Sequence, residues 1–204
     1  MRYPGEHKAQ TRAKVLAEAS RALRANGVDG VSVKTIMDRA GLTHGGFYAH
    51  FASKNDLVAH AIDHMFDERY ERTLKGMAGK APGDVLVRFI DSYLSMKHRD
   101  DVDVGCPIPA LATDAPRLST EARDRLSAGA RRLRDGIAEV LAKLEQPSPD
   151  ELAATVVSEL VGAIVTARAA ADVREARRIL NATRETLKAR LGLSDRNAQP
   201  SVSH

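Results

Sequence analysis

The feature that most constrains the fold is a short segment with a helix-ending glycine on one side and helix-starting residues on the other. Gly41 can end a preceding helix, because a residue without a Cβ readily adopts the left-handed conformation of a helix C-terminus. Thr43 and Ser53 can each begin a helix by accepting a hydrogen bond from a backbone N–H group. Only about two turns of helix fit between them, and a helix of this length is unstable alone. Phe47 and Phe51, at positions i and i+4, supply the face through which tertiary packing can hold it.

The side chains of this segment that packing does not use suit a DNA groove. Gly45 and Gly46 stand at its front, where small residues allow the backbone to approach base edges. Behind them, the phenol of Tyr48, the imidazole of His50 and the ammonium group of Lys54 match the phosphate oxygens of a DNA strand. The segment therefore predicts a recognition helix that contacts double-stranded DNA.

The preceding residues complete a helix-turn-helix. Ser32 is placed to cap a helix over 33–40, and a turn through Gly41 leads into the recognition helix. A longer helix is predicted over 8–26 from apolar residues that recur with helical spacing. Three helices of this kind make a small DNA-binding domain, which we predict over residues 1–54.

The run from residue 31 to residue 57 resembles the TetR family of bacterial transcription regulators. The shared features are a three-helix head near the N-terminus, a short glycine-containing recognition helix, a Tyr-x-His-Phe core and a Ser-Lys pair that opens the next helix. The remainder of the chain agrees with the family in length and helical character. The resemblance implies base contacts at Lys34, His44, Gly45 and Gly46 and phosphate contacts at Thr43, Tyr48, His50 and Lys54.

Basic residues are concentrated in the predicted DNA-binding domain. The chain has 31 Lys and Arg against 27 Asp and Glu, a net charge of +4. Residues 1–54 hold nine of the basic and four of the acidic residues, so this part carries +5 and the remainder −1. DNA binding gains free energy by releasing counterions from phosphates, so this distribution supports the DNA-binding interpretation.

Beyond the predicted head, the sequence reads as successive helices without an internal repeat or a convincing strand. We therefore expect an all-α fold of about nine helices. A helical regulatory and dimerisation domain is expected over 55–193, followed by a disordered tail over 194–204. Asp84 is expected to cap one helix, and Ser148 with Glu151 to form a capping box at the start of another.

The last two predicted helices suggest a dimer interface. The helix after Ser148 is apolar nearly all round, so it must be buried on all sides. One side can pack on its own domain and the other needs a partner; a central position in a monomeric bundle is the alternative. The family resemblance implies dimerisation through these helices, and a homodimer can read two half-sites. The residues expected at this interface are Leu160, Val161, Ile164, Ile179, Leu180 and Leu187.

The regulatory domain is expected to contain an inducer pocket. Only 4% of the residues are aromatic, so two or three near one another would make a plausible ligand wall. Ordinary core packing is the alternative for each of them. The candidate pocket residues are Phe66, Tyr70, Phe89, Tyr93 and Met96, and the sequence does not identify the small molecule.

The single cysteine, Cys106, is a candidate sensor of oxidants or electrophiles. Pro107 favours the first position of a helix, which makes Cys106 the N-cap, where the helix dipole stabilises a thiolate. A buried cysteine that packs as a small hydrophobic residue is the equal alternative. The segment also resembles a branch of the TetR family with a Gly-Cys pair, some members of which respond to aldehydes, quinones or oxidants.

Other classes of protein find little support in the sequence. No apolar run reaches the ~18–20 residues of a membrane span, and the N-terminus lacks the apolar core of a signal peptide, so we expect a cytoplasmic protein. His60 and His64 have a spacing that two metal ligands can use, but a third ligand is not evident and no metal site is expected. The one glycine pair of the head lacks a phosphate-loop pattern, and no cofactor is expected.

Together these features predict a dimeric transcriptional repressor that is released from operator DNA by a small ligand or by modification of Cys106. An activator of the same fold is one alternative. A thiol-dependent enzyme, with Cys106 as nucleophile and His98 as base, is an alternative from another class. No enzyme activity is expected, because the sequence has neither an oxyanion signature nor a residue to orient the base.

Overall fold

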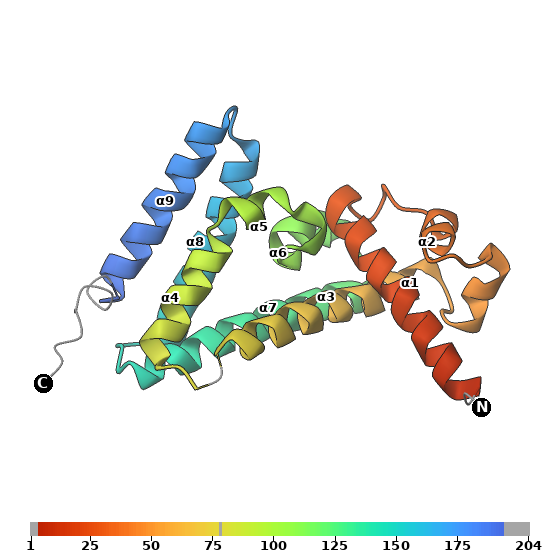
Figure 1. Cartoon of the computed structure of the whole chain (residues 1–204), viewed down its shortest axis with the longest axis horizontal. Coiled ribbons are helices and arrows are strands. Elements are labelled where there is room, and N and C mark those ends of the chain that lie inside the picture. The colour runs from red at the N-terminus through yellow and green to blue at the C-terminus, as the bar shows by residue number, and fades with distance from the viewer. Residues whose placement is uncertain (1–3, 78, 194–204) are drawn as a thin grey trace, which may run out of the picture. The chain divides into compact units, whose positions relative to one another are not determined.

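The computed structural model describes residues 4–77 and 79–193, and every regular element in this part of the chain is helical (Figure 1). The predicted all-α fold is confirmed. The elements, in chain order, are α1 (Pro4–Asn26), α2 (Val33–Arg39), the 3-10 helix η1 (His44–Ala49), α3 (Lys54–Met77), α4 (Pro82–Tyr93), α5 (Met96–Asp100), η2 (Val102–Val104), α6 (Pro107–Leu111), η3 (Ala112–Arg117), α7 (Thr120–Lys143), α8 (Pro149–Ala169) and α9 (Val173–Arg190). The tail predicted over 194–204 lies outside the described residues.

The chain folds into two compact units. The first unit contains Met1–Arg72 and Asp101–Ala130, and the second contains Thr73–Asp100 and Arg131–His204. Helices α3 and α7 each continue from one unit into the other. This division by packing differs from the domain boundary predicted after residue 54, because η2 and α6 return to pack on α1.

Apolar residues from α1, α2, η1 and α3 form one core in the first unit. The predicted stripe of α1 is buried from Val15 to Leu23, and Phe47 and Phe51 of the recognition segment join it. Leu111 of α6 is buried in the same core. The short recognition helix is therefore held by tertiary packing, as its length requires.

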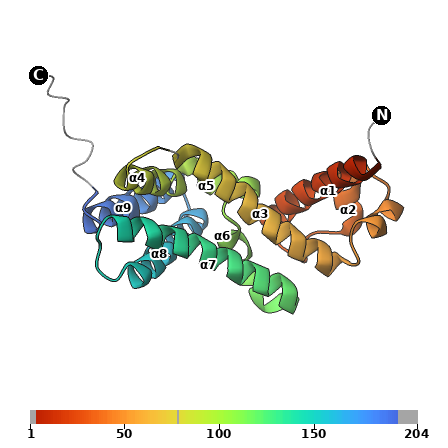
Figure 2. The same cartoon turned by 90° about the horizontal axis from the view of Figure 1, so that it is seen from below.

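Within the first unit, α3 and the beginning of α7 run side by side (Figures 1 and 2). In the first unit their contact depends on a glycine, because a Cβ on Gly129 of α7 would lie 2.1 Å from Cδ2 of Phe66 on α3. Arg125 of α7 forms ion pairs with Asp63 of α3 and with Glu121 of its own helix. Apolar and ionic contacts together fix this part of α7 to α3.

Two helix starts in the first unit follow the sequence. Ser32 Oγ accepts a hydrogen bond from the backbone N–H of Thr35 at 3.1 Å, which caps α2. Ser53 Oγ accepts one from the N–H of Asp56 at 3.1 Å, at the start of α3. The Asp56 carboxylate accepts in return from Ala52 N at 2.8 Å, a reciprocal arrangement that resembles a capping box.

The turn before η1 has the predicted backbone but a different cap. Gly41 has a φ of 72°, the left-handed conformation expected at the end of α2. Thr43 occupies the N-cap position of η1, and its side chain makes no capping hydrogen bond. The reason is that η1 is a 3-10 helix, in which the carbonyl of Thr43 itself accepts from Gly46 N at 3.1 Å.

In the second unit, α8 and α9 pack against each other and are joined by a short turn (Figure 1). Asp172, which the sequence reasoning missed, caps α9 by accepting hydrogen bonds from two backbone N–H groups. Arg99 of α5 donates to the carbonyl of Ala167 at 2.9 Å, and Arg168 of α8 donates to the carbonyl of His98 at 3.1 Å. These charged hydrogen bonds fasten α5 to the end of α8.

Two helix starts in the second unit differ from the prediction. Helix α4 begins at Pro82, and Asp84 lies in its first turn without being the cap. Proline favours the first helical position because its φ is preset and its missing N–H has no partner there in any case. Ser148 precedes α8 but has a left-handed backbone (φ 46°) and makes no capping bond, because an N-cap side chain needs an extended backbone.

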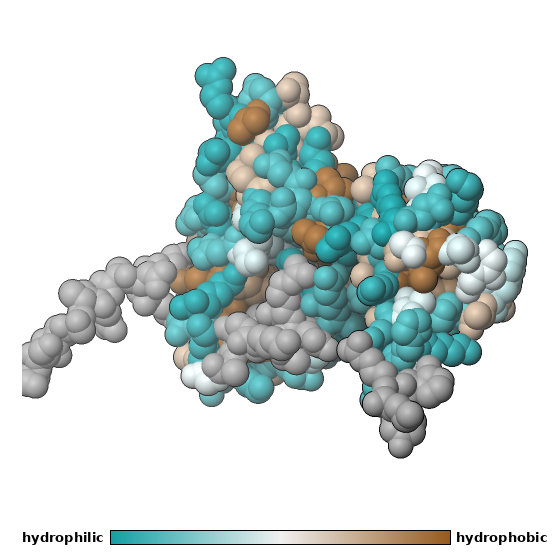
Figure 3. All heavy atoms as spheres, turned by 45° about the vertical axis from the view of Figure 1, so that its right-hand side comes forward, coloured by the Kyte–Doolittle hydropathy of each residue, from teal (hydrophilic) through white to brown (hydrophobic). Residues whose placement is uncertain are grey.

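By length and composition alone α8 could cross a membrane, contrary to the expectation that no segment is apolar enough. It has 21 residues, and its most apolar window has a mean hydropathy of 1.5. One helix of this kind is weak evidence, because core helices pass the same test. One face of α8 is buried and packs on α9. The face of the molecule in Figure 3 is mainly hydrophilic, with hydrophobic residues in small separate patches.

Candidate DNA-binding surface

The recognition helix predicted between Thr43 and Ser53 is observed as η1. Phe47 anchors it, because its buried ring stacks on that of Phe51 with the ring centroids 5.7 Å apart. Tyr48 packs edge-on against Phe47 at a centroid distance of 5.2 Å, yet its side chain is 70% exposed. The buried aromatic residue therefore holds its neighbour at the surface, where a phenol can reach a phosphate.

Gly45 and Gly46 form the front of η1, and the fold of the chain requires a glycine at neither position. A Cβ on Gly45 would meet no atom within 4 Å. A Cβ on Gly46 would lie 3.7 Å from Thr43 Oγ1 and 3.8 Å from Met37 Cε, which are ordinary contact distances. Neither glycine has a positive φ. The two glycines leave the front of η1 without protruding side chains, and internal packing does not need them. A helix that approaches base edges needs such a surface.

The other predicted contact residues also belong to the first unit. Thr43 and His44 are exposed at the start of η1, and Lys54, the first residue of α3, is half-buried. Lys34 is exposed on α2, and its ammonium group lies 3.2 Å from a carboxylate oxygen of Asp38. An exposed pair of this kind contributes little stability, so Lys34 can exchange this partner for DNA. The DNA contacts of all these residues stay a prediction.

A basic cluster that sequence reasoning missed adjoins the end of η1. Lys8 and Arg12 lie one turn apart on α1, and the guanidinium carbon of Arg12 is 4.9 Å from the centroid of the Phe51 ring. His50 ends η1, and its Nδ1 atom is buried without a hydrogen-bond partner. Burial and then the charges of Lys8 and Arg12 lower the pKa of His50 from its ordinary value. The spacing of the two cations was visible in the sequence, but only tertiary packing brings them beside η1.

The opposite end of α1 is held by the segment that contains Cys106. Arg24 is buried near the end of α1 and donates to the carbonyl of Asp103 at 3.1 Å. It also donates to the carbonyl of Met65 and to the carboxylate of Glu68, both at 3.3 Å. One guanidinium group thus joins α1 to α3 and to η2.

A second contact joins the α1–α2 turn to η3. The Asp114 carboxylate accepts a hydrogen bond from the N–H of Val28 at 3.1 Å and forms an ion pair with Arg117. Gly27 has a φ of 69°, and a Cβ there would lie 2.7 Å from Oδ2 of Asp114. A glycine is therefore required both by the backbone conformation and by the close approach of Asp114.

Cys106 stands at the N-cap of α6, directly before Pro107, where the sequence predicted a helix start. Its side chain is only 2% exposed and makes no capping hydrogen bond. The thiol is therefore packed within the protein rather than displayed to solvent. His98, the base of the thiol-enzyme alternative, belongs to the other unit, and its Nδ1 lies 2.7 Å from the carbonyl oxygen of Tyr93.

The five predicted pocket residues are divided between the two units. Phe66, which is buried, and Tyr70, which is 42% exposed, belong to the first unit. Phe89, Tyr93 and Met96 belong to the second. The rings of Phe89 and Tyr93 lie together, with centroids 5.7 Å apart. A pocket shared by all five residues stays a prediction.

Four of the six residues predicted at the dimer interface are buried within their own chain. Leu160 and Ile164 lie on the buried face of α8, and Leu180 and Leu187 lie on the buried face of α9. They are not available to a second chain, because α8 and α9 pack on each other and cover them. These four positions therefore serve intrachain packing, which corrects their assignment to a partner contact.

The exposed face of α8 carries small and apolar residues instead. Val165 is 45% exposed, and a Cβ on Gly162 would meet no atom within 4 Å. Val161, one of the predicted interface residues, is half-buried, as is Ile179 on α9. A helix face without bulky or charged side chains allows the close approach of another helix.

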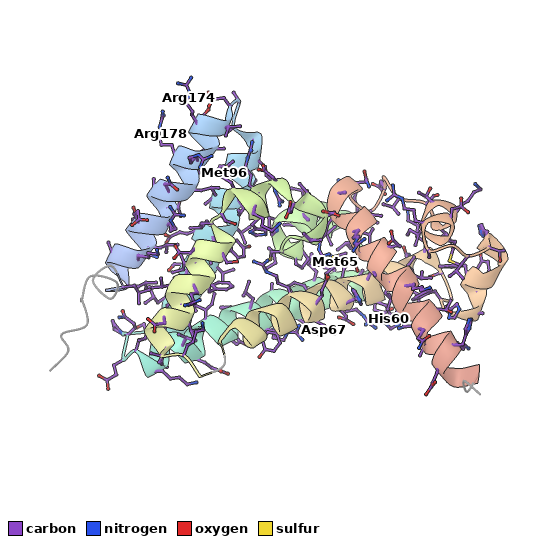
Figure 4. The ribbon with its side chains drawn as sticks, viewed as in Figure 1. His60, Met65, Asp67, Met96, Arg174 and Arg178 are labelled. Atoms are coloured by element: carbon purple, nitrogen blue, oxygen red, sulfur yellow. The ribbon has the colours of Figure 1, made fainter. Side chains whose placement is uncertain are left out.

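The exposed face of α9 is basic. Arg174 and Arg178 point away from the rest of the protein (Figure 4). With Arg177 they line a shallow surface hollow, which Asn181, Ala182 and Glu185 complete. All of these residues are on one helix, so the hollow is a feature of the surface of α9 rather than a cleft between elements.

His60 and His64 each have a protein partner. His60 Nε2 lies 3.3 Å from a carboxylate oxygen of Asp56, and His64 Nδ1 lies 3.3 Å from Ser20 Oγ. Within residues 4–77 and 79–193, no group of three or more His, Cys, Asp or Glu side chains is arranged to hold a metal ion. The described contacts of both histidines are thus those of helix packing.

Two family models match the chain. Residues 15–61 match the model of bacterial regulatory proteins of the tetR family. Residues 82–182 match the model of the C-terminal domain of LmrA/YxaF-like transcriptional regulators. The first match contains all of α2 and η1, and the second extends from α4 into α9. A comparison with curated proteins finds no match.

Several solved structures have a similar fold. A TetR transcriptional regulator from Chloroflexus aurantiacus J-10-FL is 27% identical over 92% of this chain and 96% of its own, with a TM-score of 0.78. The reduced form of Escherichia coli NemR is 17% identical over 88% of this chain and 96% of its own, with a TM-score of 0.78. A TetR-family regulator from Agrobacterium tumefaciens is 20% identical over 88% of this chain and 98% of its own, with a TM-score of 0.75.

Proposed function

Because the chain belongs to the tetR family of bacterial regulatory proteins, we propose that it is a cytoplasmic transcriptional repressor that binds operator DNA as a homodimer. Proteins of this family are transcription regulators and not enzymes, so the thiol-enzyme alternative is set aside. The chain's own geometry supports a DNA-binding role through η1 and a dimer role through α8.

The observation that carries the DNA-binding proposal is the surface of η1. Gly45 and Gly46 are not required by the packing of the chain, while Phe47 is buried and fixes the helix from behind. A low, rigid surface followed by an exposed phenol on Tyr48 fits a major groove and its flanking phosphates. The excess of positive charge in residues 1–54 adds the electrostatic attraction that such binding needs.

The dimer is proposed to form through the exposed face of α8. Val161, Gly162 and Val165 present a small and apolar surface there. Burial of such a surface against a second copy removes it from water and brings two helix backbones close together. Two heads could then read two half-sites one helical turn of DNA apart or a multiple of it.

Release from DNA is proposed to act through the segment that contains Cys106. On one side of the cysteine this segment is joined to α1 by the Arg24 contact with Asp103, and on the other side it is joined to the α1–α2 turn by the Asp114 contact with Val28. Because Cys106 is buried, a group attached to its sulfur needs space that the packed structure lacks. Modification would therefore displace the segment, disturb the contacts with α1 and reorient the head. A non-covalent inducer that moves the same segment would have the same effect.

The binding function can be tested with fluorescently labelled DNA that flanks the protein's own coding region. The wild-type protein should bind it in preference to unrelated duplex of the same length. Tyr48→Phe and Lys54→Ala should each weaken binding to both duplexes, since each removes a phosphate contact. Lys54→Ala should also lower the salt slope by about one unit, because only the lysine carries a charge that releases a counterion. Unchanged affinity in both variants at moderate salt would rule out the proposed use of the head.

A reporter gene behind the same DNA tests the sign of regulation. A repressor lowers transcription of the reporter, and an activator of the same fold raises it.

Treating the protein with maleimide, before and after partial unfolding, tests the role of Cys106. We expect maleimide to label the folded protein slowly. Labelled protein should lose DNA binding, whereas Cys106→Ser treated with maleimide should keep it. Labelled protein that keeps full operator affinity would point to a non-covalent inducer alone.

A further inference from the structure

The basic cluster at the end of η1 has a rigid support. Phe51 is buried, so its ring is fixed, and the guanidinium group of Arg12 lies over that ring at 4.9 Å from the centroid. A cation held over an aromatic face loses less conformational freedom when it binds a further partner. Arg12 is thus positioned before any ligand arrives, one turn along α1 from the exposed Lys8.

These two cations have no acidic partner among the residues that the structure describes, whereas other arginines of the same helix do. Arg21 lies 3.7 Å from the carboxylate of Glu18, and Arg24 lies 3.3 Å from that of Glu68. No carboxylate comes within ion-pair distance of Lys8 or Arg12 in the described part of the chain. The charges at this end of α1 are therefore left for something outside the protein.

The third group of the cluster is His50, which ends η1 and comes from a different element. The positive charges of Lys8 and Arg12 act on its ring and help to lower its pKa. Bringing three such groups together costs electrostatic free energy in the absence of an anion, and a bound anion would reverse this cost. The unpartnered Nδ1 of His50 is a further group that the fold itself does not satisfy.

The position of the cluster identifies the anion. It adjoins the end of the helix whose front carries Gly45 and Gly46, and a DNA strand lying along that helix places phosphodiesters at its ends. We infer that Lys8, Arg12 and His50 form a site for a backbone phosphodiester, so that α1 holds the DNA together with the helix-turn-helix. The inference rests on the proposed DNA-binding function and extends the contact surface beyond the residues expected from the sequence.

Such a site would set the position of the DNA without reading its sequence. Arg12 would supply the planar fork that matches two phosphate oxygens, and Lys8 would add a mobile point charge. Both contacts are made to the backbone, so they strengthen binding to operator and to unrelated duplex by the same factor. The site therefore contributes to affinity and salt dependence, and not to the choice of operator.

The experiment compares Arg12→Gln and Lys8→Gln with the wild-type protein, using fluorescence anisotropy with operator and with unrelated duplex over a range of salt concentrations. Each variant should bind both duplexes roughly tenfold more weakly, as the loss of a charged hydrogen bond predicts. Each should also lower the slope of log K against log salt by about one unit. Arg12→Lys keeps the charge and loses the fork, so it should weaken binding while the slope is retained.

Arg21→Gln is the matched control, because it removes an exposed positive charge from the same helix at a position already paired with Glu18. Its affinity and salt slope should equal those of the wild type. Thermal unfolding checks that each variant is folded. If Arg12→Gln does not fold, Lys8→Gln provides the test, because Lys8 is exposed and its replacement should not affect folding.

Two results would overturn the inference in different ways. If wild-type protein binds the operator while Arg12→Gln and Lys8→Gln match it in affinity and slope, α1 makes no phosphate contact and the proposed function stands. If wild-type protein binds no duplex at any salt concentration, the proposed function and the inference both fail. Weaker binding to operator only, with unrelated duplex unaffected, would also contradict a backbone contact.

Discussion

Two groups of basic residues lack acidic partners in the described part of the chain, and their surroundings differ. Lys8 and Arg12 on α1 stand beside a glycine-fronted helix, and a buried aromatic ring supports one of them. Arg174, Arg177 and Arg178 lie on the single helix α9, in a surface hollow that also contains the carboxylate of Glu185. Arg174 and Arg178 point away from the rest of the helix (Figure 4). Positive charge is therefore insufficient to identify a DNA surface. The first group differs from the second because a buried ring supports Arg12 and because the adjoining helix η1 has no protruding side chains at Gly45 and Gly46.

An exposed glycine in each unit allows a second comparison, between η1 and α8. A Cβ would meet no atom within 4 Å at Gly45 of η1 or at Gly162 of α8. Beside Gly45 the exposed side chains of η1 include the polar His44 and Tyr48, whereas beside Gly162 the side chains of α8 include the half-buried Val161 and the exposed Val165. Both glycines leave room for a partner, but the neighbouring side chains differ in polarity. We therefore expect different partners, namely DNA for η1 and a second copy of the chain for α8.

The largest effect is expected from Val165→Asp, which tests the α8 side of the comparison. The position is 45% exposed in the chain, so the subunit should fold, but a dimer would bury an unpaired charge. This should cost roughly 3–5 kcal/mol of dimerisation free energy. Sedimentation should show monomers, and operator affinity should fall with loss of the second head. A variant that sediments as a dimer would exclude this face as the interface, and Val165→Ala serves as the control.

A smaller effect, confined to DNA binding, is expected from Gly45→Leu. A Cβ at this position meets no atom of the protein within 4 Å, and the glycine has no positive φ, so stability and dimerisation should be unchanged. It would stand between η1 and the base edges and should weaken operator binding by roughly a hundredfold, the ~3 kcal/mol of a lost base contact. Gly162→Leu should show the opposite pattern, with a weaker dimer and intact heads. If both variants behave alike, the two surfaces do not have separate partners.

A few-fold effect is expected from pH, acting through His50. Burial and the charges of Lys8 and Arg12 hold the pKa of His50 below 6.5 in the protein without DNA. A nearby phosphate raises that pKa, so the complex binds more protons than the separate molecules. Operator affinity should therefore rise as the pH falls through the pKa of the complex, and level off below that of the protein alone.

Anisotropy titrations between about pH 7.5 and about pH 6 would measure this effect. The part due to His50 should disappear in His50→Gln and persist in the control His44→Gln. A pH dependence that is identical in wild type and His50→Gln would show that other groups are responsible.

The smallest effect is expected from replacing Arg174, Arg177 and Arg178 together with Gln. These residues lie on α9 in the second unit and are not part of the proposed DNA surface. Operator affinity and its salt slope should change by less than twofold at moderate salt, because long-range attraction between exposed charges is screened. A loss as large as that of Arg12→Gln would remove the distinction between the two basic groups.

The sequence was most informative where local chemistry determines structure. Ser32, Gly41 and Ser53 have short-range roles that need only a few neighbouring residues, and all three adopt them. Phe47 and Phe51 could be predicted as the anchor of η1 because an isolated helix of that length needs one.

The sequence was less informative where distant segments meet. Leu160 and Leu187 were predicted to face a partner, but both are buried within their own chain. An apolar pattern shows that a residue is buried, and it does not show which chain buries it. Arg12 was missed because its position beside η1 depends on the packing of α1 on the head. The contact of Asp114 with Val28 joins residues far apart in the chain, and no local pattern indicates it.

The role of η1 in reading DNA is tested most directly by the binding of wild-type protein and Gly45→Leu to the DNA that flanks the coding region, with their sedimentation measured in parallel. The wild type should bind this duplex in preference to unrelated DNA, and Gly45→Leu should sediment as the same dimer but lose the preference. Equal binding of both proteins to the operator, or no preference by the wild type, would contradict the assignment of η1 as the surface that reads DNA.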